Sequence, residues 1–98
     1  MREKEIESYL VKAIKKMGGE AFKFVSPGNA GMPDRIVILP NGEIYFVELK
    51  SEDGRLRPTQ IRQQERLYVL GCNVATLKGK EEVDRFLREV ILNEVHTA

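Results

Sequence analysis

The spacing of hydrophobic residues changes several times along the chain, and each change marks a predicted element. Where apolar residues recur every three or four positions we expect helices. Short runs rich in β-branched and aromatic residues, bounded by glycine, proline or polar residues, are typical of strands. In chain order, these patterns predict a helix over 3–17, strands over 21–25, 35–39 and 44–49, a helix over 58–70, a strand over 74–77 and a helix over 80–95.

The two middle strands carry apolar side chains on both faces, which predicts a sheet covered on both sides. One face carries Ile36, Ile38, Ile44 and Phe46, and the other carries Val37, Leu39, Tyr45, Val47 and Leu49. The strand over 74–77 is expected parallel to the strand over 44–49, through a right-handed crossover. The predicted fold class is therefore α/β, a mixed sheet flanked by helices in the order α-β-β-β-α-β-α. The helices are expected to turn Ile61, Leu67, Tyr68, Leu70, Val83, Phe86, Leu87, Val90 and Ile91 inward.

The turn between the two middle strands sets their register. Pro40-Asn41-Gly42 suits a three-residue loop, with glycine in the left-handed third position. In that register Leu39 faces Glu43, and counting back places Asp34 opposite Glu48. A two-residue Asn41-Gly42 turn would instead place Asp34 opposite Leu49, and a slip of one residue moves a side chain to the other face. A pairing of the two carboxylates therefore requires the three-residue loop.

Three charged residues are brought together by this hairpin. Glu48 and Lys50 lie two apart in a strand, so their side chains share a face about 6.6 Å apart along it. Paired carboxylates without a histidine or cysteine partner suit a hard cation such as Mg²⁺, which prefers oxygen ligands and shares them with a substrate phosphate. A nearby ammonium could orient a water molecule or stabilise negative charge. Asp34, Glu48 and Lys50 are thus candidates for phosphodiester chemistry.

Length and composition are consistent with a single intracellular domain over residues 1–98. The 98 residues, 42% of them hydrophobic, suffice for one core with little surplus burial, so dimerisation would help. One cysteine excludes an intramolecular disulfide framework and suits a reducing compartment, and no apolar run reaches transmembrane length. The charged first residues do not read as a signal peptide. We expect a cytoplasmic protein, in a bacterium or a phage-infected host cell, with no membrane partner.

The ordered motifs resemble one known family. Glu7 in the first helix, Gly31-x-Pro33-Asp34, Glu48-x-Lys50 and Leu56-Arg57-Pro58-Thr59-Gln60 follow the pattern of the PD-(D/E)xK nuclease superfamily, and most closely its virus-type replication-repair nuclease (VRR-NUC) domain. The resemblance runs from Glu7 to about Phe86. It implies a restriction-endonuclease-like core, a metal held by Asp34 and Glu48, and a site completed by Glu7 and Gln60. The family tends to place serine where this chain has Arg57, which leaves the capping of that helix open.

The resemblance implies a metal-dependent DNA endonuclease. Mg²⁺ or Mn²⁺ would be held by Asp34, Glu48 and the carbonyl of Leu49, with Lys50 assisting the attacking water. Stand-alone members resemble phage proteins that act as homodimers on branched DNA such as four-way (Holliday) junctions. Candidate phosphate contacts are Arg55, Arg57, Arg35 and Lys23. A nicking or flap-directed endonuclease and a non-catalytic DNA-binding subunit that keeps the fold are the alternatives.

A simpler interpretation of the acids is structural. Asp34 could cap a turn, and Glu48 with Lys50 could form a solvated pair at a strand edge. That interpretation leaves both acids on a face otherwise filled with isoleucine and phenylalanine, where charged groups rarely lie without partners or a metal. Gln60 could be an ordinary first-turn residue of its helix, with Gln64 one turn further on. The residue pattern therefore favours the metal site.

Overall fold

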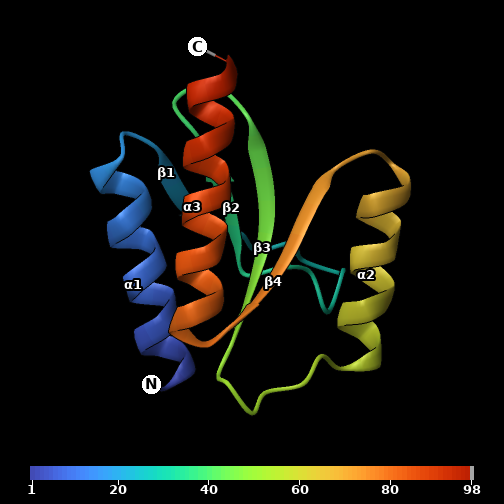
Figure 1. The fold of residues 1–98 in the computed structure, drawn as a ribbon. Helices are drawn as coiled ribbons and strands as arrows, with labels where there is room; N and C mark the ends of the chain where they lie inside the picture. The colour runs from blue at the N-terminus through green and yellow to red at the C-terminus, as the bar shows by residue number, and fades with distance from the viewer. Residues whose placement is uncertain (98) are drawn as a thin grey trace.

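The protein folds as three helices around a four-stranded sheet, in the predicted order (Figure 1). The computed structural model describes residues 1–97, and side chains up to residue 92. The bounds are α1 Glu3–Lys16, β1 Glu20–Lys23, β2 Arg35–Ile38, β3 Ile44–Lys50, α2 Pro58–Val69, β4 Asn73–Lys78 and α3 Gly79–Thr97. Each predicted element is present, with ends displaced by at most two residues. None of the helices in this part of the chain is long and apolar enough to cross a membrane.

The sheet has the strand order β1-β2-β3-β4, with the first two pairs antiparallel and β3 parallel to β4. The turn between β2 and β3 is the predicted three-residue loop. Its backbone N–H groups close it, because Leu39 donates to the Glu43 carbonyl over 2.9 Å and Gly42 donates to the Leu39 carbonyl over 2.8 Å. Gly42 has a φ of 87°, the left-handed conformation expected there. The register of the hairpin is confirmed.

The main core lies on one face of the sheet, beneath α1 and α3, which run side by side in Figure 1. Alternate residues of the central strands point into it, and the helices contribute apolar residues at helical spacing. The buried members include Ile6, Leu10, Ile14, Val37, Leu39, Val47, Leu49, Leu77, Val83, Phe86 and Val90. The predicted inward positions of α3 hold except for Ile91, which is 45% exposed. This face supplies the stability of the domain.

The opposite face is only half covered, so the expectation of a sheet enclosed on both sides is wrong in part. α2 packs over β4, whereas Phe22 and Ile44 at the other end of this face remain 54% and 45% exposed. The predicted inward face of α2 is also wrong. Leu67 is buried as expected, but Tyr68 is 75% exposed and the other buried positions of the helix are glutamines. The reason is that α2 covers a polar row of the sheet, described next, so its inner face is polar too.

Candidate active site

The pairing of the strands sets four residues, Phe24, Asp34, Glu48 and Thr76, in a row across the half-covered face. Arg35 pairs with Val47, so the next position along places Asp34 beside Glu48. The backbone N–H of Phe24 donates to the Asp34 carbonyl over 2.9 Å, which extends the pairing of β1 to this row. Thr76 is the partner of Glu48 on β4. The two acids therefore project from adjacent strands toward the same side, with α2 above the β4 end.

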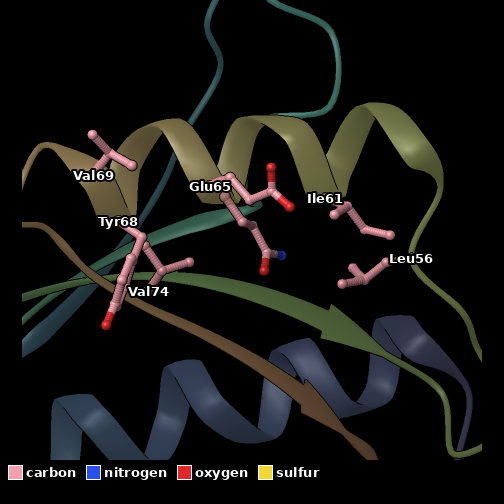
Figure 2. A pocket seen from close by; sticks show the side chains of 7 residues that line it. Leu56, Ile61, Glu65, Tyr68, Val69 and Val74 are labelled. Atoms are coloured by element: carbon pink, nitrogen blue, oxygen red, sulfur yellow. The ribbon is translucent and has the colours of Figure 1, made fainter.

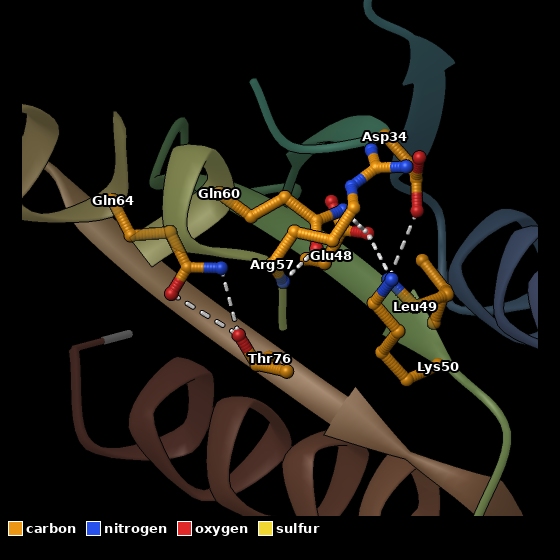
Figure 3. Close-up of polar contacts among 8 residues, drawn as sticks. All are labelled: Asp34, Glu48, Leu49, Lys50, Arg57, Gln60, Gln64 and Thr76. Atoms are coloured by element: carbon orange, nitrogen blue, oxygen red, sulfur yellow. Dashed lines mark hydrogen bonds and ion pairs between the residues drawn. The ribbon is translucent and has the colours of Figure 1, made fainter. Parts of the chain in front are cut away.

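Glu48 is almost completely buried, with 2% of its surface exposed. Its Oε2 atom accepts a hydrogen bond from the Nε2 of Gln60 over 3.0 Å and lies 3.7 Å from the Nζ of Lys50 (Figure 3). Its Oε1 atom is buried without any hydrogen-bond partner. A buried carboxylate oxygen that lacks a partner is costly, and such atoms are usually explained by a function or by a bound ion. Glu48 thus has one oxygen oriented by the protein and one left over.

The electrostatic environment of Glu48 matches this picture. Burial, and then the negative charge of Asp34, raise the pKa of Glu48 to about 7, although the positive charge of Lys50 acts in the opposite direction. Glu3, in the first turn of α1, adds a smaller upward contribution to the same pKa. Two carboxylates held together in a low-dielectric place repel each other unless a cation or a proton joins them. The site therefore favours a positive charge.

Asp34 closes the end of the β2–β3 pairing with its side chain. Its Oδ2 atom accepts a hydrogen bond from the backbone N–H of Leu49 over 3.1 Å (Figure 3). In a continuing antiparallel ladder that N–H would donate to the backbone carbonyl of Pro33, and the Asp34 carboxylate accepts it instead. The Asp34 carboxylate is therefore anchored to β3 beside Glu48.

The start of α2 is built into the site through Gln60. The side-chain oxygen of Gln60 accepts the backbone N–H of Arg57 over 2.8 Å, and its amide nitrogen donates to Glu48. Gln60 thereby caps the helix in place of Arg57, whose side chain carries no acceptor. One turn further on, Gln64 and Thr76 exchange hydrogen bonds of 2.9 and 3.1 Å (Figure 3). Gln60 therefore lies beside Glu48, as the resemblance implied, and Gln64 lies beside Thr76 on the neighbouring strand.

The loop that leads into Asp34 is held against α2. A side-chain amide of Gln63 donates to the carbonyl of Ala30 over 3.0 Å. Gly31 has a φ of 90°, and a Cβ atom there would lie 2.7 Å from the backbone of Thr59. Only glycine combines this conformation with so close an approach. The geometry of the acid pair therefore depends in part on contacts made several residues away from it.

Two predicted roles are not supported by the contacts. Glu7 and Arg35 form an ion pair of 2.8 Å, and Arg35 also donates to the Ala21 carbonyl over 3.0 Å. Arg35 alternates with Asp34 along the strand, so it points under α1, to the face opposite the acids. The guanidinium of Arg35 is engaged on that face with Glu7 and Ala21, and its predicted contact with DNA stays a prediction. The carboxylate of Glu7 hydrogen-bonds to Arg35 rather than to Asp34, Glu48 or Lys50.

The remaining basic candidates are accessible. Arg55 and Arg57 are exposed in the segment between β3 and α2, immediately after the acid–lysine strand, and Lys23 is exposed at the end of the edge strand β1. Of the three, Arg55 and Arg57 are the closer to Glu48 along the sequence, because they follow β3 directly. They remain candidate phosphate contacts.

The donor set fits a hard divalent cation. Within the side chains that the structure describes, no three His, Cys, Asp or Glu residues gather closely enough to hold a metal, so the carboxylate ligands would be Asp34 and Glu48 alone. The Oε1 atom of Glu48, which is buried without a hydrogen-bond partner, is an oxygen that such a cation could bind. Mg²⁺ binds through one or two carboxylates and keeps several waters, which suits so sparse a site.

Comparison with known proteins decides the family. The VRR-NUC domain family matches residues 2–81 of the chain. The chain belongs to the VRR-NUC family. A protein named "Putative nuclease p44", from Acyrthosiphon pisum secondary endosymbiont phage 1, is 48% identical over 81 residues, which cover 83% of this chain and 87% of that protein. A solved VRR-NUC domain superposes with a TM-score of 0.80 at 32% identity, covering 88% of this chain and 94% of that one.

Membership confirms the resemblance and the α/β fold, and makes this chain a VRR-NUC nuclease domain. One weak electrostatic influence on Glu48 was not predicted from the sequence. Glu3 acts on the pKa of Glu48, whereas the reasoning selected Glu7, one turn later in the same helix. Both are glutamates in α1. Which of them influences Glu48 depends on how the start of the helix lies against the sheet, which the sequence pattern does not give. The charge of the first turn was a usable signal, because α1 begins where β3 ends (Figure 1).

Proposed function

We propose that this protein is an Mg²⁺- or Mn²⁺-dependent endodeoxyribonuclease that hydrolyses phosphodiester bonds. The observation that carries the proposal is the acid pair on adjacent strands, in which Glu48 is buried and keeps one oxygen without a partner. Lys50 lies beside the pair. Membership of the VRR-NUC family supplies the nuclease context.

Each residue of the site has a part in this proposal. Asp34, Glu48 and the carbonyl of Leu49 would hold the cation, which when bound polarises a phosphoryl oxygen and makes water more acidic. Gln60 keeps the Glu48 carboxylate in one orientation through its hydrogen bond of 3.0 Å. The Lys50 side chain, only 12% exposed, holds its ammonium where it can position a water or stabilise negative charge on the phosphate. Arg55 and Arg57 contact the DNA backbone.

The deciding experiment measures cleavage of labelled DNA with Mg²⁺, with Mn²⁺ and with EDTA. We expect cleavage by the wild type only with metal, loss of cleavage in Asp34→Asn, and a fall of about 100-fold or more in Lys50→Ala. Matched controls are Asp53→Asn, an exposed carboxylate in the following loop, and Lys12→Ala, an exposed lysine of α1; both should retain activity. Tight DNA binding without metal-dependent cleavage would instead favour a non-catalytic DNA-binding subunit.

The proposed substrate is branched DNA, with a four-way junction favoured. A symmetric dimer would present two sites to two strands, as the paired cuts at a junction require. Junction, flap, single-stranded and linear duplex substrates compared side by side separate this from a nicking or flap-directed enzyme. Preference for a flap or for nicked duplex over the junction would reject the junction while leaving the nuclease proposal intact.

The exposed surface of α2 supports a homodimer, and the first and last helices are the alternative surfaces. Apolar residues of α2 and Val74 of β4 line an open pocket of about 470 Å³ beside the helix (Figure 2). The exposed apolar residues of this helix and its end are Ile61 44%, Tyr68 75%, Val69 82% and Leu70 78%. Arg62, Glu65 and Arg66 flank them, so an antiparallel second copy could place Glu65 against arginines. We therefore place the second copy here.

The dimer surface can be tested by the mass in solution. Light scattering after gel filtration should give a dimer for the wild type and a monomer for Val69→Asp, which puts a charge in the centre of the α2 surface. Ile91→Asp on α3 is the matched control and should remain a dimer. The opposite pattern, a monomer only for Ile91→Asp, would move the interface to the last helix.

A further inference from the structure

The pairing between β2 and β3 ends earlier than β3 itself. β3 continues to Lys50 and stays paired with β4 as far as Lys50 opposite Lys78. On its other side, its pairing with β2 ends at Arg35 opposite Val47. Continued by two residues, the same register puts residue 33 opposite Leu49. That residue is Pro33, and its side chain is fully buried.

The direction of the Leu49 peptide groups follows from the contacts. In an antiparallel ladder the N–H and the C=O of a residue point to the same neighbouring strand. The Leu49 N–H points toward β2, because it donates to the Oδ2 of Asp34. The Leu49 carbonyl therefore points to that side too, next to Asp34. If the ladder continued in this register, a residue with a backbone N–H at position 33 would donate it to this carbonyl.

Proline cannot do so, because it has no backbone N–H. We propose that Pro33 is a positioning residue, which leaves the Leu49 carbonyl without a ladder donor so that it can serve beside Asp34 as an oxygen ligand for a divalent cation. The inference rests on the proposed metal-dependent function. It explains why a proline at position 33, directly before Asp34, would serve that function. The Asp34 carboxylate accepts the Leu49 N–H in place of the Pro33 carbonyl, while Pro33 has no N–H to donate to the Leu49 carbonyl.

The competing explanation is that the proline ring only packs the start of β2. The two explanations differ in one atom group, the N–H, so they can be separated chemically. Pro33→Ala restores the N–H and removes the ring. N-methylalanine at position 33, introduced by chemical synthesis of the 98-residue chain, removes the ring without restoring the N–H. Pro27→Ala, at an exposed proline of the same loop, is the matched control.

Mn²⁺ and Mg²⁺ affinities of these proteins are measured by calorimetry in the absence of DNA. We expect Pro33→Ala to bind about 10- to 100-fold more weakly, as is usual when the support of a ligand is lost. The N-methylalanine protein and Pro27→Ala should bind as the wild type does. In Pro33→Ala, the new backbone amide at position 33 should exchange slowly with solvent, because it bonds to the Leu49 carbonyl. Equal weakening in both proteins altered at position 33 would assign the effect to the ring and overturn the proposal.

A measurement on the wild type covers the case in which Pro33→Ala does not fold. With ¹³C at the Leu49 carbonyl, titration with diamagnetic Mg²⁺ should shift that resonance as the site fills. A resonance that stays in place while calorimetry records binding would overturn the role of the carbonyl, and with it that of Pro33, but would leave the metal-dependent nuclease standing. If the wild type binds neither metal, the proposed function and this inference both fail.

Discussion

Leu49 and Glu48 are adjacent in β3, and both are buried, yet they lie in different kinds of surroundings. Leu49 points into the core beneath α1 and α3, where its neighbours are aliphatic. Glu48 points beneath α2, where its partners are Gln60 and Lys50 and one oxygen has none. Alternation along a strand separates these environments within one residue. The sheet is therefore stabilised on one face and carries its chemistry, at a cost in stability, on the other.

The largest effect on stability is expected from the covered face. Leu49→Ala should lower the free energy of unfolding by about 2–5 kcal/mol, because it removes a fully buried side chain and leaves a cavity. Ile44→Ala, in the same strand but 45% exposed on the other face, is the control and should cost less. Urea denaturation of both variants measures the difference. Equal losses would show that the two faces contribute alike.

Substitution of Glu48, one residue earlier, is expected to raise the free energy of unfolding rather than lower it. The pKa of Glu48 is raised to about 7 in the folded protein, above its ordinary value of 4.5. Its protonated form is therefore stabilised by folding, and this contribution is full below pH 4.5 and is lost as the pH rises through 7. The loss amounts to about 3 kcal/mol. Glu48→Gln, which carries no charge, should lack this loss and be more stable than the wild type at pH 8 in EDTA, while losing cleavage.

Unfolding free energies of both proteins between pH 4 and pH 8 give the test, since other titrating groups cancel in the difference. A difference in unfolding free energy that does not change with pH would mean that folding does not raise the pKa of Glu48. With metal present the slope should reverse, because cation binding competes with the proton, and cleavage should fall toward acidic pH. Activity that stays flat from pH 5 to pH 8 would count against the metal site.

The covered face and the hairpin were predictable from sequence for one reason, which is that their patterns are local. The turn Pro40-Asn41-Gly42 determines the register by its length, and the register determines that Asp34 meets Glu48. The inner face of α2 was not predictable in the same way. The rule that apolar residues point inward selected Tyr68, but the helix faces a polar row and buries Gln63 instead. What a helix covers is a property of the assembled fold.

A smaller effect is expected where the loop before Asp34 meets α2. Gly31→Ala places a Cβ in the left-handed region and 2.7 Å from Thr59, so it should cost more than the roughly 1–2 kcal/mol of that conformation alone, and lower cleavage by moving Asp34. Gly28→Ala is the matched control, because Gly28 has a φ of 81° with open space around it. Thermal melts and cleavage rates compare the two. Similar results for both would mean that the contact with Thr59 does not hold the loop.

The smallest effects are expected in α1, where Glu3 and Glu7 lie one turn apart. Glu7 pairs with Arg35 on the core face of the sheet, whereas Glu3 acts on the pKa of Glu48 on the other face. The carboxylate of Glu7 pairs with Arg35 and is 27% exposed, so Glu7→Gln should cost about 1 kcal/mol in stability and change cleavage little. Glu3 contributes to the raised pKa of Glu48. Glu3→Gln should therefore lower that pKa slightly and leave the melting temperature nearly unchanged. A Glu7→Gln protein that melts normally but no longer cleaves would restore Glu7 to the site, and would mean that its pairing with Arg35 is broken when DNA binds.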